Sequence, residues 1–364
     1  MFTDEEKKVV KKEIQYHAAE EKDLADISAL IDSMQSDPVE RLNIRSRSPE
    51  YFRWMYLQNP AGRAWVYCAR HRGKLISTFA MAPKFVKLGD TVVRCGKTMD
   101  MFTDPNYQGL GLMSKLALQV FDAAKRDGLE MWYVTPSANS YPIFVKKWGY
   151  IENFEVVFLN KILNPDAIIQ AMVKPRWAAP AVAGLAAGLN RLLHVFKRDA
   201  SPYEVSVMDR FGEETDTLWE QSRNRYRVML VRDSSYMNWR YVSNPDSYIK
   251  LLFKRNGSVC GLLILKQTIR GGMKVGEIVD FLYADDRKNL FGMLRHGLEF
   301  LRKQGCAFAQ AWAIEGAEME SDLRAAGLRI KRKRFKFLFS PDAPCDLFYS
   351  RDGWFLVQGD GNDI

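Results

Sequence analysis

The ten-residue pattern Tyr-x-x-Trp-x-Tyr-x-x-Asn-Pro occurs twice in this chain, once from Tyr51 to Pro60 and once from Tyr236 to Pro245. Five matching positions of uncommon residue types within ten residues are hard to obtain by chance. The sequence that follows each copy also runs in parallel. We therefore interpret the 364 residues as a tandem duplication, which requires a fold that is built twice.

Each copy is followed by the same alternation of apolar runs and turns. The runs are residues 64–69, 75–82 and 92–103 in the first half and 248–253, 259–265 and 275–283 in the second. A turn such as Asn256-Gly257 between two apolar runs predicts a β-hairpin. Helical apolar spacing, a buried strand, a short helix and a last strand come next in both halves. Each half is thus predicted to be a mixed α/β sheet, with a β-meander followed by α-β-α-β.

The repeat divides the chain into domains at 1–163 and 203–364, joined by a linker at 164–202. Two domains agree with the usual size of about 100–200 residues. The linker contains an apolar stretch of about 13 residues from Trp177, shorter than the roughly 20 needed to cross a bilayer. Residues 174–198 are expected to form a helix packed on a domain or, with their basic flanks, a helix at a membrane surface.

The composition of the chain favours some kinds of function and excludes others. The five cysteines show no spacing typical of metal ligands, which favours a metal-free protein of the reducing cytoplasm. The N-terminus is charged from its fourth residue and has no apolar signal segment. The net charge of +9 suits a polyanionic ligand, an anionic surface or nucleic acid. Because the densest basic run, 329–336, accompanies no recognition motif, nucleic-acid binding is not expected.

The segment 104–116 joins the third strand of the first half to its first long helix. Gly109 and Gly111 allow the main chain to turn its N–H groups inward, and the start of the helix adds unpaired donors and the positive end of a dipole. A pyrophosphate can bind there without a metal ion or a lysine. The segment therefore predicts an anion site.

Together with Thr103-Asp-Pro, Asn139, Phe144 and Trp148-Gly-Tyr, this loop resembles the GNAT acetyltransferase superfamily. Gln108 and Gly111 match the family loop (Arg/Gln)-x-x-Gly-x-(Gly/Ala), whereas Met113 stands at its final small position. The resemblance covers residues 14–159 and implies acyl-CoA, with acetyl-CoA as the commonest form, as co-substrate. The residues that it implies for binding are Met101, Phe102, Thr103, Gln108, Gly109, Leu110, Gly111, Leu112, Met113, Ser114, Asn139 and Phe144.

The second half lacks this loop. Residues 284–292 contain no Gly-x-Gly and place Asp285 and Asp286 where the phosphate would lie, and like charges there oppose CoA. We expect a degenerate GNAT-like domain and one CoA per chain.

Candidates for catalysis follow from the same resemblance. Asp100, in the strand before the loop, is a candidate base or anchor for the amine, although its recurrence as Asp280 equally suits a structural role. The tyrosine that many GNAT enzymes use as acid is replaced by Val145, so Tyr141, one helical turn earlier, is the substitute candidate. Trp54 and Tyr56 lie where the family builds the acceptor side, but their recurrence also suits packing.

The predicted function is acyl-CoA-dependent N-acyl transfer, most often N-acetyl transfer, to a small amine. Residues 354–363 resemble the tails of GNAT-like proteins from polysaccharide gene clusters, which indicates an amino sugar as acceptor. The alternative is an inactive CoA-binding or membrane-associated scaffold. The oligomeric state is not predicted.

Overall fold

In the computed structural model, the first half of the chain follows the predicted order of elements. The structure describes residues 2–34, 47–172, 202–284, 286–341, 343 and 346–361. The elements of the first half are α1 (Asp4–Glu13), β1 (Gln15–Ala18), η1 (Glu21–Asp23), α2 (Leu24–Met34), α3 (Pro49–Phe52), η2 (Arg53–Leu57), β2 (Trp65–His71), β3 (Lys74–Leu88), β4 (Thr91–Thr103), η3 (Pro105–Tyr107), α4 (Leu112–Arg126), β5 (Trp132–Val134), η4 (Ile143–Lys147) and β6 (Ile151–Ile162).

The second half repeats the meander, the long helix and the closing strands. Its elements are β7 (Glu204–Val207), α7 (Glu213–Ser222), η6 (Arg223–Arg225), β8 (Val228–Leu230), α8 (Ser234–Tyr241), β9 (Ile249–Arg255), β10 (Ser258–Arg270), β11 (Met273–Tyr283), α9 (Arg287–Lys303), β12 (Phe308–Ile314), α10 (Glu318–Ala325), β13 (Arg329–Phe339), η7 (Asp346–Tyr349), η8 (Arg351–Gly353) and η9 (Gln358–Asp360). The helix α5 (Pro165–Met172) lies between the halves, in the predicted linker. The mixed α/β class predicted from the sequence is confirmed.

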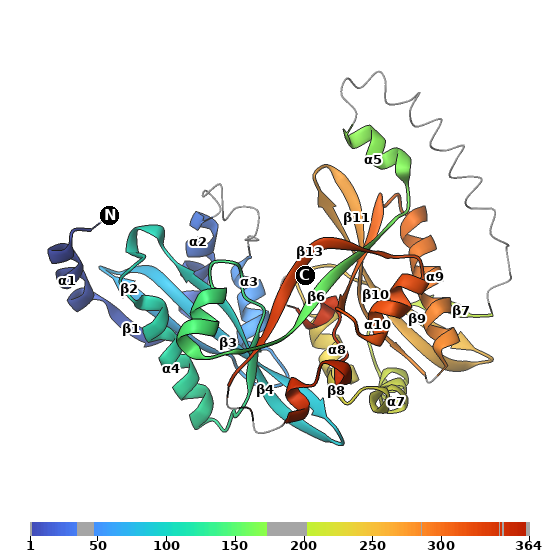
Figure 1. The fold of residues 1–364 in the computed structure, drawn as a ribbon, viewed down its shortest axis with the longest axis horizontal. Coiled ribbons are helices and arrows are strands. Elements are labelled where there is room, and N and C mark those ends of the chain that lie inside the picture. Colours follow the sequence, from blue (N-terminus) through green and yellow to red (C-terminus); the bar gives the residue numbers. More distant parts are fainter. Residues whose placement is uncertain are drawn as a thin grey trace.

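The two halves exchange their last strands. The strands form one sheet in the order β1-β2-β3-β4-β5-β13-β6-β12-β11-β10-β9-β7, with β8 paired to β3. β6 pairs with β12 of the second half, and β13 pairs with β5 of the first. Figure 1 shows the green β6 and the red β13 crossing in the middle of the molecule. The segments 1–163 and 203–364, suggested as domains by the sequence, therefore share one continuous sheet.

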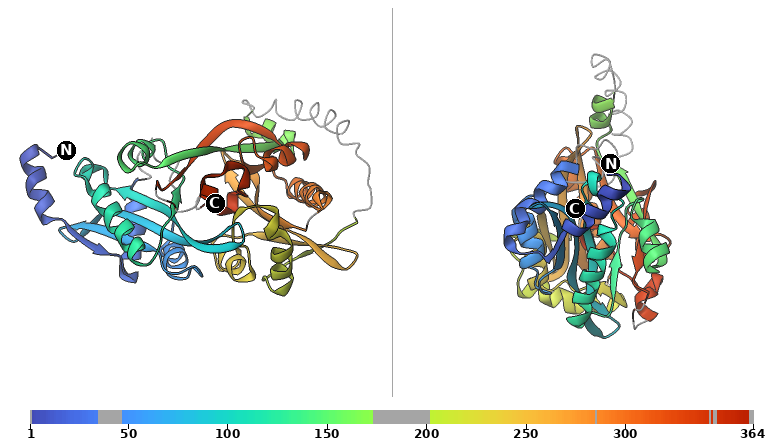
Figure 2. Two further views of the ribbon diagram at one scale, coloured as in Figure 1. Left: turned by 60° about the horizontal axis from the view of Figure 1, so that its bottom comes forward. Right: turned by 90° about the vertical axis from the view of Figure 1, so that its left-hand side faces the viewer.

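The helices cover both faces of this sheet (Figure 2). Leu112, Leu116 and Val120 of α4 are buried and pack with Phe79 and Met81 of β3, as the helical spacing predicts. α2 and α3 belong to a different cluster, which contacts the sheet through alternate residues of the same strand, such as Ala80. Successive residues of a strand point to opposite faces, so α4 and the pair α2/α3 lie on opposite sides of β3.

The repeated pattern lies at the junction of the halves. The indoles of Trp54 and Trp239 stack with centroids 4.8 Å apart and planes 19° apart. The Nε1–H of Trp54 donates to the main-chain carbonyl of Trp239 at 2.7 Å, and the Nε1–H of Trp239 donates to the carbonyl of Trp54 at 3.1 Å. Both side chains are buried. This reciprocal pair relates α8 to η2 by an approximate two-fold axis.

The predicted linker segment 174–198 lies outside the described residues. Of the helices that the structure does describe, none is long and apolar enough to cross a bilayer.

Candidate functional site

β4 and β5 separate shortly after they meet. Their parallel pairing consists of Gly96↔Trp132 and Lys97↔Tyr133. The register of β4 with β3 shifts between Thr78 and Ala80, opposite Asp100, whose φ is +49°. A β-bulge of this kind bends its strand and increases the local twist. The part of β4 beyond Lys97 therefore splays away from β5, and its main chain loses that neighbour.

The loop after β4 ends at an uncapped helix. Gly109 and Gly111 have φ of +77° and +79°, and a Cβ at either position would meet nothing within 4 Å. Gly111 is the N-cap of α4 and provides no side chain to the helix, whose first intrahelical donor is the N–H of Lys115. The preceding N–H groups at 112–114 therefore face the open side of the loop. This arrangement can bind an anion.

Lys147 adds a positive charge at the same helix end. Its Nζ lies 2.5 Å from Oγ of Ser114, in the first turn of α4. Lys147 comes from η4, and its side chain is exposed. No sequence motif links Lys147 to Ser114, which lies 33 residues earlier, so its place at this helix end was not predicted.

The loop is anchored on its other side by a line of polar side chains. The Tyr107 hydroxyl lies 2.9 Å from Nδ1 of buried His71, and Nε2 of the same ring lies 3.0 Å from Glu13. Asp104 accepts from the N–H of Asn106 at 2.9 Å. These contacts fix the entry to the loop against α1 and β2 before the glycines begin.

Asp100 is enclosed by two partners. Nη1 of Arg47 donates to Oδ1 at 2.5 Å, and the hydroxyl of Tyr56 donates to Oδ2 at 2.7 Å. Burial, and next the charge of Asp100, raises the pKa of Tyr56 well above its usual value, so the phenol stays protonated and acts as donor. The carboxylate is only 3% exposed. An amine could reach either oxygen only by displacing Arg47 or Tyr56.

The same triad recurs in the second half. Arg232 donates through Nε to Oδ1 of Asp280 at 2.9 Å, and Tyr241 donates to Oδ2 at 2.7 Å. Arg47 and Arg232 each stand nine residues before the second Tyr of their pattern (47 to 56, 232 to 241). The repeat therefore begins four residues earlier than the sequence analysis recognised, and aligning the flanks of the two copies would have revealed both arginines.

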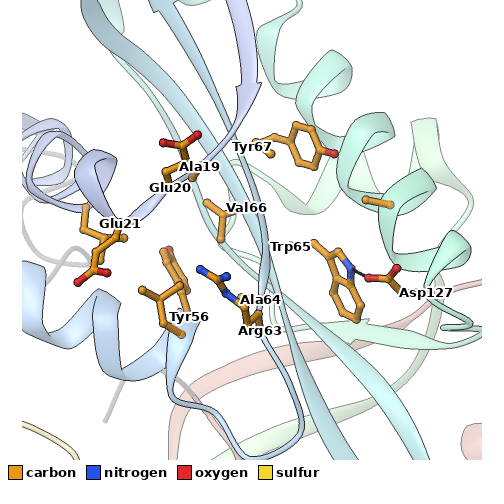
Figure 3. Close-up of a pocket in the computed structure, with 14 residues that line it drawn as sticks. Ala19, Glu20, Glu21, Tyr56, Arg63, Ala64, Trp65, Val66, Tyr67 and Asp127 are labelled. Carbon is orange, nitrogen blue, oxygen red and sulfur yellow. Dashed lines mark hydrogen bonds between the residues drawn. The ribbon is translucent and has the colours of Figure 1, made fainter.

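Three predicted contact residues are buried. Trp54 packs in the indole stack between the halves. Tyr56 is 1% exposed, donates its hydroxyl to Asp100, and also lines the pocket of Figure 3. Phe144 is fully buried and packs edge-to-face on Trp148 and Tyr150 at 5.0 and 4.8 Å. Its ring belongs to the core, because an aromatic residue in a short helix has the same sequence signature whether it packs or binds.

Tyr141 lies apart from the Asp100 triad. Its hydroxyl donates to Glu152 of β6, and that hydrogen bond raises its pKa. Nζ of Lys336, on β13, lies 5.1 Å from the centroid of its ring. The structure shows no shared partner between Tyr141 and Asp100 among the described residues. The two predicted catalytic side chains are thus not brought into one hydrogen-bonded unit.

The other predicted CoA contacts line the splayed strand, the loop and the turn before η4. The exposed ones are Gln108, Gly109, Gly111 and Asn139, the partly buried ones are Met101, Phe102, Thr103, Met113 and Ser114, and the buried ones are Leu110 and Leu112. The buried pair can contribute only main-chain groups, since both side chains pack in the core beneath α4.

The equivalent helix end in the second half is closed. Asp286 is the N-cap of α9, and its Oδ1 accepts from the N–H of Lys288 at 2.8 Å. Its carboxylate occupies the main-chain N–H of Lys288 at the helix end, and its negative charge repels a phosphate. Asp285, the other predicted carboxylate, lies outside the described residues.

We therefore expect calorimetric titration with acetyl-CoA to give one site per chain. Of the two long helices that follow the meanders, α4 lacks a side-chain cap and α9 is capped by Asp286. Gly111→Val should weaken the single site and reveal no second one, because the end of α9 offers no substitute. Two sites of similar affinity in the wild-type chain would contradict the assignment.

Figure 3 shows a pocket of about 350 Å³ at the opposite end of α4. Ala123 and Asp127 contribute from that end, and Asp127 accepts from the indole N–H of Trp65 at 2.6 Å. The 15 residues of α4 separate the pocket from the loop by about 22 Å. The pocket is therefore distinct from the anion site. Across the described ranges, no group of three or more His, Cys, Asp or Glu side chains is arranged to hold a metal ion.

Comparisons with known proteins agree with this geometry. Residues 15–151 match the family model "Acetyltransferase (GNAT) domain", whereas the search of curated proteins gave no match. Yeast (Saccharomyces cerevisiae) N-myristoyltransferase with bound myristoyl-CoA has a similar fold, with TM-score 0.64, 10% identity, and 94% of this chain and 89% of that chain covered. A conserved Enterococcus faecalis protein titled "Probable N-Acyltransferase" gives TM-score 0.61 and 12% identity over 93% of this chain and 75% of that one.

At these identities the two structures show a shared fold. The chain is thus similar to the acetyltransferase (GNAT) domain over residues 15–151, and its overall fold is similar to that of the two solved structures.

Proposed function

We propose that this protein transfers an acyl group from acyl-CoA to an amine. The observation that carries the proposal is the uncapped N-terminus of α4 at the mouth of the splayed strands β4 and β5, within the segment matched as an acetyltransferase domain. The pyrophosphate of CoA would accept hydrogen bonds from the N–H groups at 112–114, with Lys147 beside it. Acetyl-CoA is the simplest donor.

The splayed strand would align the rest of the donor. Main-chain groups of β4 beyond Lys97 lack a β5 partner, so the amides of the pantetheine arm can bind there as an added strand would. The thioester then lies near the bulge, where main-chain N–H groups can stabilise the oxyanion. The acceptor nitrogen attacks the thioester carbon, a C–N bond forms, the C–S bond breaks, and the nitrogen releases one proton to solvent. Because a thiol has a pKa near 8.5, the thiolate leaves without an obligatory acid.

Within this proposal Asp100 is a positioning residue. Its ion pair with Arg47 and its bond to Tyr56 hold the bulge at a φ that non-glycine residues rarely adopt. The corresponding triad around Asp280, in which Arg232 also bonds to Asp360, lies in the half whose helix end is closed, which favours a role in the sheet over a role in proton transfer. Tyr141 would order the rim of the site through Glu152, so Tyr141→Phe should have a small effect on turnover.

The variant Asp100→Asn tests this assignment, with Asp280→Asn as the matched control. The amide weakens the bond to Arg47, and we expect the free energy of unfolding to fall by about 1–3 kcal/mol in both variants. Urea titration measures this loss. In Asp100→Asn, kcat should fall no more than about tenfold, and the pH dependence of kcat should keep its shape. A loss of turnover of about 10²–10⁴ in a variant with unchanged stability would instead identify Asp100 as the base.

The function itself is tested by two measurements on the full chain. Titration with acetyl-CoA reports binding, and release of free thiol in the presence of a panel of amines, amino sugars included, reports transfer. Turnover with an amine supports the proposal, whereas binding without turnover across the panel would favour a CoA-binding scaffold. The amino-sugar acceptor, a cytoplasmic location and membrane contact through 174–198 remain proposals.

A further inference from the structure

Lys84 of β3 is buried at the junction between the halves and has no hydrogen-bond partner for its amine. Its side chain is 1% exposed. Nζ lies 4.6 Å from the ring centroid of Trp239 and 5.7 Å from that of Tyr236, both on α8. A buried polar group without a partner is uncommon and calls for an explanation.

The surroundings hold this amine in its uncharged form. Burial, followed by the charges of Arg240 and Lys97, lowers the pKa of Lys84 well below its usual value, and Asp360 opposes this only in part. An uncharged amine carries a free lone pair and is nucleophilic. Lys84 thus differs from a surface lysine in reactivity as well as in position.

A pocket of about 80 Å³ adjoins Lys84. It is lined by Asn59, Pro60, Ala61, Lys84, Phe85, Val231, Asp233, Ser235 and Tyr236. The hydroxyl of Tyr236 is also buried without a partner. The Asn59 amide already bonds to main-chain groups, and Asp233 caps α8 through the N–H of Tyr236. Two residues with unpaired buried polar groups therefore line one small space, which only a very small reactant can enter.

The positive side chains near Lys84 favour the formation of an anion at that position. Arg240 is buried, and its guanidinium donates to the main-chain carbonyls of Gly359 and Gly361 at 3.1 and 2.7 Å. Neither acceptor is a carboxylate. Arg232, in contrast, bonds to both Asp280 and Asp360. The positive charge of Arg240 is thus the less neutralised of the two and would be stabilised by an anion on Lys84.

From this arrangement we propose that Lys84 is a site of reversible carbamylation by carbon dioxide. The lone pair of Nζ attacks the carbon of CO2, an N–C bond forms, and one C–O π bond becomes the negative charge of the carboxylate. The nitrogen releases one proton to solvent, so the step needs no oxidant or reductant. The product adds three heavy atoms to the pocket. Its oxygens accept from the hydroxyl of Tyr236 and place a negative charge toward Arg240.

The modification would join the halves, since it links β3 of the first half to α8 of the second. It is independent of acyl transfer, because none of its groups belongs to the loop or to the splayed strands.

Chemical trapping tests the proposal directly. The full-length protein is incubated with bicarbonate and treated with a trialkyloxonium salt, which converts a carbamate into a stable ester that peptide mass spectrometry detects. Lys87, on the same strand as Lys84, and Lys97, on the neighbouring β4, are internal controls, because both are buried and donate to the carbonyls of Tyr226 and Asp360. We expect the ester on Lys84 at least tenfold above either control, and less of it in Tyr236→Phe. An unmodified Lys84 peptide in saturating bicarbonate, or equal labelling of the three lysines, would overturn the proposal.

Thermal unfolding gives a second readout. Bicarbonate should raise the Tm of the wild-type protein relative to chloride at the same ionic strength and pH, and it should leave the Tm of Lys84→Met unchanged. An equal shift in both proteins would mean that bicarbonate acts elsewhere, and the proposal would fail.

Discussion

Replacing Gly111 by Val is expected to weaken the affinity for acetyl-CoA by at least about 100-fold. The residue has φ of +79°, and its missing side chain leaves open space in front of the first N–H groups of α4. A valine would strain the main chain and fill that space. Loss of two hydrogen bonds to a charged group costs about 3 kcal/mol or more, which corresponds to two orders of magnitude in Kd. Calorimetric titration measures the change.

Gly73→Val is the matched control for this experiment. Gly73 has φ of +80°, and a Cβ there also meets nothing within 4 Å, but it lies in the turn between β2 and β3. It should suffer similar strain and keep its affinity for acetyl-CoA. If both variants lose affinity equally, or if Gly111→Val binds normally while folded, the loop is not the phosphate site.

The second large effect is expected at the indole pair. Trp54→Ala removes a fully buried ring from between the halves, together with the hydrogen bond that its indole N–H donates to the main-chain carbonyl of Trp239. Truncation of a buried aromatic side chain costs about 3–5 kcal/mol of unfolding free energy, which urea denaturation would detect as a lower midpoint. Trp54→Phe keeps a ring but loses the N–H donor, so it should lie between the wild type and Trp54→Ala. Unchanged stability in Trp54→Ala would contradict the packing role.

Local signals account for the parts of the fold that the sequence predicted. The apolar spacing of Leu112, Leu116 and Val120 is a property of one helix, and the glycine-rich turn before it requires no distant partner. The meander strands are joined by short turns, so their pairing follows from order along the chain. The glycine-rich loop before α4 could be predicted because all of its parts lie within a few residues of one another.

The parts that were missed depend on pairing between distant segments. β6 is largely apolar, whereas β13 begins with the basic run and ends in the apolar segment 337–339, and nothing in either strand specifies which half it joins. Lys147 reaches Ser114 only through the packing of η4 beside α4. The triads are an intermediate case, because Arg47 and Arg232 were visible in the repeat once its upstream flank was compared.

The exchange of the last strands affects the order in which the chain can fold during its synthesis. β5 of the first half has β13 as its neighbour on one side, through Val134↔Leu338 and Tyr133↔Phe339. Leu338 itself is buried among the residues beneath α4, in the same cluster as Leu112 and Leu116. During synthesis on a ribosome, the segment that carries the glycine loop therefore stays incomplete until β13 (Arg329–Phe339) has emerged. A nascent chain stalled before residue 329 should remain sensitive to protease in its N-terminal half, since pairings this far apart in sequence form late.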